Sequence, residues 1–353
     1  MTPFFRKILP QIFISAILED KKNTLKICTY RNKKLINKIE KTFDKSERLI
    51  AFVENYDKKF FPYHIALFLD SEEQGILPSG EQNYDEFGIG KMSIKTLPLG
   101  DASLYAATEH IEYFSELCED CGGLDFLFSP FALLHFCIQK EKQDDKTRLY
   151  AYKCGQSLAL MVYQKGKILI GSYKLFEKSP SFEFDSFGNA DLNDENLNDK
   201  ELNKEANSLE NKEEKQEREI SLDNFNEVLG DKIDALDDNQ LDDNQEEGQD
   251  LSQETQQDIQ MQNDGDIKMD ELGKFSEDME VCRFVISSIE SFYHDLHYGG
   301  DFVDEIVIFS DEMLMQSTLE FVENETFLKP QVKLIDTLDL MQEVMQKELK
   351  YDL

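Results

Sequence analysis

Two cysteines stand at the spacing that metal and redox sites often use. Cys118 and Cys121 are separated by two acidic residues, and thiols at this spacing bind zinc or form reversible disulfides in other proteins. No second such pair, no pair of histidines at zinc-site distance and no Ser/His/Asp or Cys/His arrangement follows. We therefore expect no catalytic residue and no metal ligand. The cysteines are interpreted as reduced, buried thiols, with a metal or redox role for this pair as the alternative.

Polar residues also stand in turns that directly follow short apolar runs. Loops held by a rigid scaffold carry most binding and catalytic residues, so the function has to be sought in these turns. The residues concerned are, in chain order, Glu19 and Asp20, then Lys153, Gly155 and Gln156, and finally Ser310 and Asp311.

The second of these turns belongs to a predicted meander of strands over 148–176. Three short runs rich in Val, Ile, Tyr and Leu lie within it, separated by turns that contain Gly155 and Gly166. Glycine reaches positive φ without a Cβ penalty, so both turns carry the residue type that a hairpin needs. A near-copy of this pattern over 11–43 predicts the same meander at the N-terminus.

Each meander is followed by alternating helices and strands. Apolar residues at helical spacing predict the helices, and short apolar runs predict the strands between them. The predicted fold class is α/β, with two duplicated lobes built on mixed sheets. The predicted helices are 46–55, 102–118, 130–139, 281–298, 313–322 and 338–349, and the predicted strands are 63–69, 124–128, 302–309 and 332–335.

A strongly acidic stretch interrupts the second predicted lobe. Residues 181–280 hold 33 Asp and Glu against 8 Lys and Arg, a net charge of −25 out of −34 for the whole chain. Such a composition buries too little apolar surface to offset its conformational entropy, so we predict a disordered acidic insert. Within it, 221–236 has apolar residues at helical spacing. This segment is either an amphipathic helix for a partner or a transient helix without one.

The composition excludes several classes of partner. The acidic balance argues against nucleic acid, because binding its phosphates requires clustered Lys and Arg. No apolar run approaches the length that spans a bilayer, and no signal-peptide pattern opens the chain. We expect a cytoplasmic protein with no transmembrane segment. The apolar and basic residues of 1–10 leave a weak contact with a membrane surface open.

The order of elements resembles the actin-like ATPases of the ribonuclease-H-like fold, and more narrowly the PilM and GspL proteins of type IV pilus assembly and type II secretion. The resemblance rests on the lead-in FFRK before QIFISAIL, on the second meander, and on the helix that runs into Gly299-Gly300 before FVDEIVIF. It implies a first actin-like lobe in 1–145, with a small inserted subdomain at 69–104. It implies a second lobe in 146–180 and 281–353.

The resemblance also implies a nucleotide cleft made by three loops, and this chain departs from the family in each of them. The first turn of actin-like ATPases pairs an acid with small residues, whereas Glu19 and Asp20 are followed by no glycine. The second loop has Lys153 where an acid is expected, two residues before Gly155, and Gln156 follows the glycine. The third loop has acidic residues after the strand in place of a glycine pair. The family relationship thus implies a degenerate cleft formed by Glu19, Asp20, Lys153, Gly155, Gln156, Ser310 and Asp311.

The resemblance favours a cytoplasmic scaffold that does not hydrolyse ATP. It would belong to a type IV pilus, type II secretion or DNA-uptake (competence) machine and bind the cytoplasmic tail of an inner-membrane assembly protein at the membrane face. We expect no cofactor, with weak binding of ATP and magnesium left open. One alternative is an active actin-like ATPase of the same machinery. Another is an acidic interaction protein that acts through 181–280.

Overall fold

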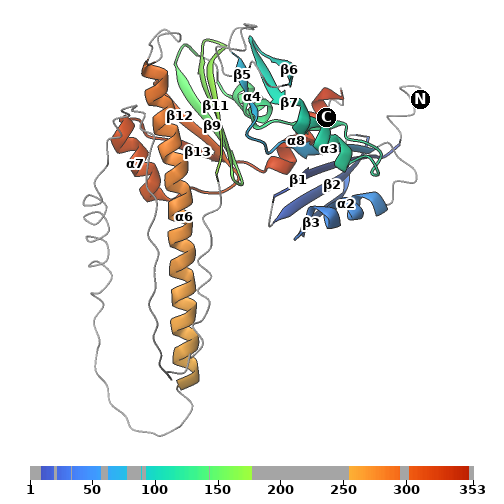
Figure 1. The fold of residues 1–353 in the computed structure, drawn as a ribbon, viewed down its shortest axis with the longest axis horizontal. Helices are drawn as coiled ribbons and strands as arrows, with labels where there is room; N and C mark the ends of the chain where they lie inside the picture. Colours follow the sequence, from blue (N-terminus) through green and yellow to red (C-terminus); the bar gives the residue numbers. More distant parts are fainter. Residues whose placement is uncertain are drawn as a thin grey trace, which may run out of the picture. The chain divides into compact units, whose positions relative to one another are not determined.

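The computed structural model describes residues 9–19, 22–32, 34–56, 63–77, 89, 93–142, 144–176, 254–294 and 302–349. The chain divides into two units, one formed by 1–181 with 265–353 and the other by 182–264. Both predicted lobes belong to the first unit (Figure 1). The possible helix at 221–236 lies outside the described residues.

The first lobe is built on a five-stranded sheet in the order β3-β2-β1-β4-β8. β1 (Gln11–Ile17), β2 (Asn23–Arg31) and β3 (Lys34–Phe43) form an antiparallel meander. β4 (Tyr63–Phe68) pairs with β1 in parallel, and β8 (Phe126–Phe128) pairs with β4 in parallel. The near-continuous apolar run of β4 suits a strand that is covered on both faces.

The second lobe repeats this arrangement with the order β11-β10-β9-β12-β13. β9 (Arg148–Cys154), β10 (Ser157–Gln164) and β11 (Lys167–Leu175) form the antiparallel meander. β12 (Glu305–Ser310) and β13 (Gln331–Leu334) extend it in parallel. The repeated topology confirms the predicted fold class, a duplicated α/β fold with mixed sheets.

The hairpin turns of the second meander have the predicted backbone. Gly155 has φ +53° and Gly166 has φ +84°. These values lie in the left-handed region, where a side chain would clash with the following carbonyl. The two glycines therefore allow the tight turns that return β9 to β10 and β10 to β11.

The helices and sheets alternate in layers. α4 and α8 lie between the two large sheets, because their apolar residues share one core with residues of β1, β4, β9 and β12. α2 and α3 cover the other face of the first sheet, and α6 and α7 cover the other face of the second. The bounds are α2 Ser46–Asn55, α3 Thr108–Leu117, α4 Pro130–Lys140, α6 Glu254–His294, α7 Gln316–Thr326 and α8 Thr337–Glu348.

A third, three-stranded sheet is inserted into the first lobe in the order β5-β7-β6. It consists of β5 (Gln74–Leu77), β6 (Ile94–Leu99) and β7 (Ala102–Ala107). The predicted helix over 102–118 is therefore wrong at its start. Buried side chains alternate with half-buried ones at the start of β7, the two-residue repeat that is typical of a strand. β5 and β6 also pair with β7 on both sides, so this segment forms a strand despite its helix-compatible residues.

α6 begins within the stretch predicted to be disordered. The helix runs from Glu254, and its described side chains begin at Leu272. Asp278 is 1% exposed and its carboxylate accepts a hydrogen bond from the backbone N–H of Met315 (2.7 Å). The prediction of disorder over 181–280 is therefore wrong for 272–280, because a buried acceptor fixes this part of the helix to the segment before α7.

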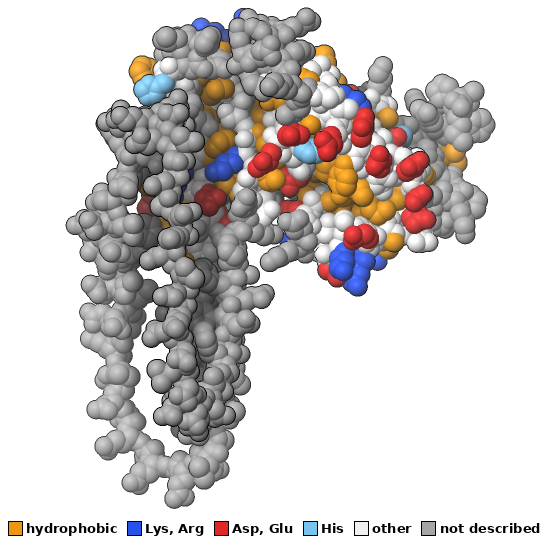
Figure 2. Space-filling view, in the orientation of Figure 1, with side chains coloured by type: hydrophobic (Ala, Val, Ile, Leu, Met, Phe, Trp, Pro, Cys, Tyr) orange, Lys and Arg blue, Asp and Glu red, His pale blue; other side chains and the backbone are white. Residues whose placement is uncertain are grey.

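The surface follows the acidic composition. Among the side chains coloured on the face in Figure 2, acidic groups are more frequent than basic ones. None of the described helices combines the length and the apolar character that crossing a membrane requires.

Candidate functional site

The parallel pairing of β9 with β12 brings two of the predicted loops together. Lys153 is opposite Ser310 in the register, so the turn after β9 and the loop after β12 leave the sheet at the same edge. Gly155 and Asp311 occupy the first positions beyond these strands. Their proximity follows from the sheet alone, since neighbouring parallel strands end on the same side.

Asp311 is bonded to the turn that carries Gly155. The backbone N–H of Gly155 donates a hydrogen bond to Oδ2 of Asp311 (2.9 Å), and the N–H of Asp311 donates to the carbonyl oxygen of Lys153 (3.4 Å). Bonds from a backbone N–H to a carboxylate are charge-assisted and stronger than neutral ones. The amide of Gly155 is thus already satisfied by an anion from the same lobe.

Glu19 reaches the same turn from the first lobe. A Cβ placed on Gly155 would collide with Oε1 of Glu19. Without that Cβ, the carboxylate group lies against the backbone of the turn. Carboxylates from both lobes therefore flank Gly155, and the space beside this glycine is filled by the side chain of Glu19.

The pKa of the buried Cys154 thiol reflects the negative charge at this edge. Burial raises the pKa of Cys154 well above its usual range, and the carboxylates of Asp311, Glu19 and Asp70 add to the effect. The thiol is therefore protonated. Asp70 follows β4 in the first lobe and accepts a hydrogen bond from the hydroxyl of Tyr173 in β11 (3.0 Å), so the two lobes are also bonded here.

Lysines at the same edge face Glu312. Burial alone would raise the pKa of Glu312, but the ammonium groups of Lys153, Lys274 and Lys22 outweigh burial and lower it. Nζ of Lys274 lies 3.3 Å from Oε2 of Glu312. The positive charges that could attract a phosphate are thus partly neutralised by the chain's own acid.

Two of the other predicted site residues, Ser310 and Gln156, form hydrogen bonds with the local backbone. Ser310 is fully buried and its hydroxyl accepts a hydrogen bond from the N–H of Glu312 (3.2 Å). The carbonyl oxygen of Gln156 accepts one from the N–H of Phe176 (2.9 Å). Asp20 lies outside the described residues. The structure therefore brings Glu19, Lys153, Gly155 and Asp311 to one edge and gives Ser310 and Gln156 local bonds.

A buried lysine between the lobes was not predicted. Lys26 of β2 has no exposed side-chain surface, and its Nζ lies 2.8 Å from Asp336, 2.6 Å from Asp339 and 2.9 Å from Glu40. Burial alone would lower the pKa of Lys26, but the hydrogen bonds from these carboxylates raise it above its usual value. Lys26 is therefore a charged group that ties the first sheet to the start of α8.

Neutral hydrogen bonds extend this connection along α8. Nε2 of Gln342 donates to the hydroxyl of Ser15 (3.2 Å) and to the carbonyl oxygen of Lys26 (3.1 Å). The hydroxyl of Ser15 donates to the carbonyl oxygen of Leu338 (3.2 Å). The first sheet and α8 are thus joined by ion pairs and by buried polar bonds.

Two sequence signals could have identified the missed residues. Lys26 interrupts the apolar strand NTLKICTY, and a lysine at a buried strand position needs an acidic partner. Asp70 is the second residue after β4, which is parallel to β1, so it leaves the sheet at the same edge as Glu19. No local pattern names Tyr173 as its partner, because that contact depends on how the lobes pack.

No group of three or more His, Cys, Asp or Glu side chains in the described part of the chain is arranged to hold a metal ion. Cys118 and Cys121 are both buried and not disulfide-bonded. At the edge between the lobes, carboxylates and lysines therefore surround the turn at Gly155 without forming a metal site in the described part of the chain.

Several solved structures are similar to the chain. A Bacteroides thetaiotaomicron protein with an actin-like ATPase fold and unknown function is 10% identical, with a TM-score of 0.45, and the match covers 98% of this chain and 99% of that one. The PilM-PilN type IV pilus biogenesis complex is 9% identical, with a TM-score of 0.46 and coverage of 95% and 93%. The cytoplasmic domain of EpsL from the type II secretion system of Vibrio cholerae is 11% identical, with a TM-score of 0.31 and coverage of 46% and 70%.

Sequence comparisons identify families without an assigned role. No curated protein matches the chain. A family model described as Domain of unknown function (DUF8569) matches residues 9–135, which form most of the first lobe. Because a second model matches residues 149–350, more than half of the chain, the chain belongs to the family described as Domain of unknown function (DUF8341).

Proposed function

We propose that this chain is an actin-like scaffold that does not hydrolyse ATP. It works in a type IV pilus, type II secretion or DNA-uptake machine and binds the cytoplasmic tail of an inner-membrane partner. The protein is then located in the cytoplasm, at the face of the inner membrane. The proposal has two parts, the absence of nucleotide chemistry and the binding of a partner, and each has its own test.

The bond between Gly155 and Asp311 carries the first part. A phosphate bound in a glycine turn needs backbone N–H donors that are aimed at it. Here the N–H of Gly155 already donates to a carboxylate from its own lobe. A nucleotide would have to displace this charge-assisted bond before it gained one.

The position of Glu19 supports the same conclusion. Its carboxylate lies against Gly155, where an entering phosphate would meet a like charge. With Asp311 and Asp70 also acting on Cys154, the electrostatic environment disfavours a polyanion. The residues present therefore do not fit a triphosphate group.

The ion pairs between Lys26 and the start of α8 also oppose nucleotide binding. Glu19 of the first lobe fills the space beside Gly155 of the second, so separation of the lobes is one way to make room for a nucleotide there. Separation would pull Lys26 away from Asp336 and Asp339 and leave a buried ammonium group without these partners. Breaking these pairs would cost about 2–3 kcal/mol, because the carboxylates are about half exposed. Lobes held in a fixed arrangement suit a scaffold.

The second part concerns the inserted subdomain. The resemblance to PilM-type proteins implies that the partner's tail binds at this subdomain, and β6 is one of the two edge strands of its sheet. Among the described strands only β7 pairs with β6, and Leu97 of β6 is 58% exposed. A strand edge with an exposed apolar side chain is a common acceptor for an extended peptide. The machine itself is assigned from the sequence resemblance to the PilM and GspL proteins.

Calorimetric titration of the full-length chain with Mg-ATP tests the first part. We expect no saturable heat for the wild type. The variants Asp311→Asn and Glu19→Gln reveal whether these carboxylates are the cause, because each removes one negative charge beside Gly155. Magnesium-dependent, saturable binding by the wild type would refute the pseudo-ATPase proposal and favour the ATPase alternative.

Co-purification from the host membrane tests the second part. The tagged full-length chain is expected to retain an inner-membrane assembly protein of one of the three machines, and Leu97→Ser is expected to reduce the retained amount. Leu35→Ser in β3 is the matched control, because Leu35 is similarly exposed (49%) on a distant strand. Failure to retain any such protein, or equal loss with both variants, would count against the proposed partner.

A further inference from the structure

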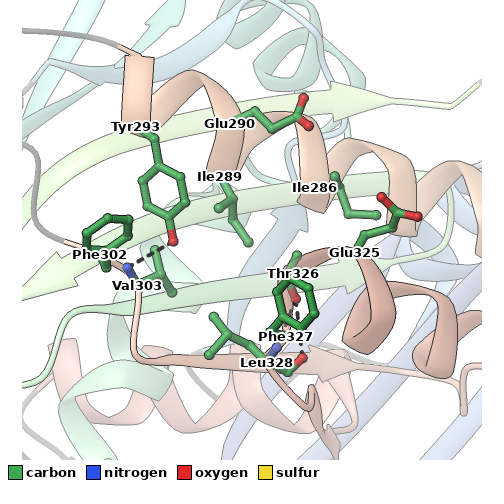
Figure 3. Close-up of a pocket in the computed structure, with 10 residues that line it drawn as sticks. All are labelled: Ile286, Ile289, Glu290, Tyr293, Phe302, Val303, Glu325, Thr326, Phe327 and Leu328. Atoms are coloured by element: carbon green, nitrogen blue, oxygen red, sulfur yellow. Dashed lines mark hydrogen bonds between the residues drawn. The ribbon is translucent and has the colours of Figure 1, made fainter.

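An apolar pocket opens in the second lobe, away from the turns around Gly155. It has a volume of about 410 Å³ and is bounded by the end of α6, the segment before β12 and the end of α7 (Figure 3). Its apolar lining includes Ile286, Ile289, Val303 and Leu328. A pocket of this size accommodates a few apolar side chains.

Three aromatic side chains at the pocket are partly or largely exposed. Phe302 is 77% exposed, Phe327 is 89% exposed and Tyr293 is 37% exposed. The rings of Tyr293 and Phe302 contact each other edge to face, with centroids 5.3 Å apart. Aromatic residues are enriched in protein interfaces because they bury a large area with few rotatable bonds.

Phe327 is held in a conformation that disfavours its side chain. It caps α7 with φ +58°, a region that costs a bulky residue about 1–2 kcal/mol and that glycine occupies freely. Burial offsets such a cost in other proteins, but here the ring is almost fully exposed. Within the described chain, little of the phenyl surface is buried, so its burial contributes little to the stability of the fold.

The walls of the pocket are already ordered. The hydroxyl of Tyr293 accepts a hydrogen bond from the N–H of Val303 (3.2 Å). The hydroxyl of Thr326 accepts one from the N–H of Leu328 (3.2 Å) and donates to the carbonyl oxygen of Val322 (2.7 Å). A binding surface fixed in this way loses little conformational entropy when a partner binds.

The charge at the pocket selects the kind of partner. Glu290 and Glu325 belong to its lining and both are exposed. In the described part of the chain, neither carboxylate has a basic ion-pair partner, and no lysine or arginine lines the pocket. An apolar segment that also carries Lys or Arg would bury its anchors against the aromatic rings and place its charges near these acids.

We propose that this pocket binds a peptide segment of a partner protein with apolar anchors next to Lys or Arg residues. The aromatic side chains and the pocket floor take the anchors, and Glu290 with Glu325 selects the basic flanks. This proposal does not depend on the identity of the machine or on the behaviour of the turns around Gly155. It explains why Phe327 is exposed at a position that suits glycine.

Selection from a phage-displayed library of random dodecapeptides tests the proposal with the full-length chain. We expect the wild type to enrich peptides that combine apolar anchors with Lys or Arg. Phe327→Gly should lose this enrichment and weaken binding of a selected peptide by about tenfold or more, the effect of removing an interface anchor. This variant keeps a residue suited to φ +58°, so loss of binding would not reflect unfolding.

Matched variants separate charge from apolar contact. Glu290→Gln with Glu325→Gln should weaken the selected peptide severalfold at low salt and remove most of its salt dependence. The control surface is α3, where Tyr113 is 56% exposed beside Glu112 and Glu116. Tyr113→Ala and Glu112→Gln with Glu116→Gln should leave the affinity unchanged.

Three outcomes would overturn the proposal. The wild type and Phe327→Gly could enrich the same peptides or none, or the enriched peptides could be acidic or uncharged. Sedimentation could also detect a wild-type dimer that dissociates in Phe327→Gly, which would identify the pocket as an interface between two copies of the chain.

Discussion

The turns around Gly155 and the pocket at the end of α7 differ in whether their groups already have partners within the chain. At the turns, the N–H of Gly155 donates to Asp311, and Glu19 fills the adjacent space. At the pocket, the rings of Phe302 and Phe327 are largely exposed. A ligand at the turns has to break existing bonds, whereas a ligand at the pocket has only to cover surface.

Under the proposed function, this difference places the binding of a partner at exposed apolar surface and not at the turns around Gly155. At the turns, the hydrogen bond to Asp311 and the side chain of Glu19 already occupy the surroundings of Gly155. The outer face of the second lobe carries an apolar surface without an evident role in stability. The following variants test each side of the contrast by measuring the free energy of unfolding.

Replacing Lys26 should have the largest effect. Lys26→Met removes the buried ammonium group and leaves Asp336, Asp339 and Glu40 without their shared partner. We expect a loss of about 2–3 kcal/mol, at the lower end for a buried ion pair because these carboxylates are about half exposed. Urea unfolding monitored by circular dichroism measures it.

Lys146→Met is the control for that measurement. Lys146 also forms an ion pair, with Glu305, but its side chain is 51% exposed. Ion pairs on the surface contribute little to stability because water and salt screen them, so the control should change stability little. Equal effects of the two variants would show that the lobes are not held together through Lys26.

The strands and most helices were predictable because their signals are local. The glycine turns of the second meander and the apolar face of α2 each lie within a few residues of sequence, and the bounds of α2 agree with the predicted 46–55. The start of β7 was not predictable in this way. Its helix-compatible residues become a strand because β5 and β6 pair with both of its edges.

The candidate site was predictable only where the sheet dictates proximity. Gly155 and Asp311 meet because β9 and β12 are parallel neighbours, so their loops could be placed together from the predicted strands. The main partners of Lys26 could not be assigned, since Asp336 lies 310 residues later in the chain. The contact depends on how α8 packs against the first sheet, which no local pattern encodes.

Adding a methyl group at Gly155 should have the next largest effect. Gly155→Ala forces alanine into φ +53° and displaces the carboxylate of Glu19. We expect a loss of about 1–2 kcal/mol from the left-handed backbone and about 0.5 kcal/mol more from the contact with Glu19. Denaturant unfolding of the single variant and of Gly155→Ala with Glu19→Ala separates the two contributions.

Gly166→Ala provides the matched reference for backbone strain. Gly166 also has positive φ, +84°, but a Cβ there meets nothing within 4 Å. Its cost should not change in the Glu19→Ala background, whereas the cost of Gly155→Ala should fall. If both costs are independent of Glu19, its side chain does not fill the space beside the turn.

Acidification should weaken the connection between the lobes by a smaller amount. Burial alone would raise the pKa of Asp336, but Lys26 lowers it, and Lys38 with Lys26 lowers the pKa of Glu40. Carboxylates with depressed pKa values stabilise the fold above about pH 4 and lose this contribution as the pH falls through the folded-state pKa. After allowance for their exposure, wild type should lose about 1 kcal/mol more than Lys26→Met between pH 6 and about pH 3. Parallel pH-dependent slopes for the two proteins would contradict this role of Lys26.

Phe327→Gly should produce the smallest change, and it should be a gain. Glycine relieves the backbone strain at φ +58° but has more conformational freedom in the unfolded chain, so we expect a net stabilisation of about 0.5–1 kcal/mol. The exposed ring offers little burial to lose. Thermal and urea unfolding measure the change, with Tyr113→Gly in α3 as a control that should destabilise. A gain in stability together with weaker peptide binding would show that the phenyl group serves the pocket at the expense of the fold. A loss of stability would show that Phe327 supports the fold, and the contrast between pocket and turns would then disappear.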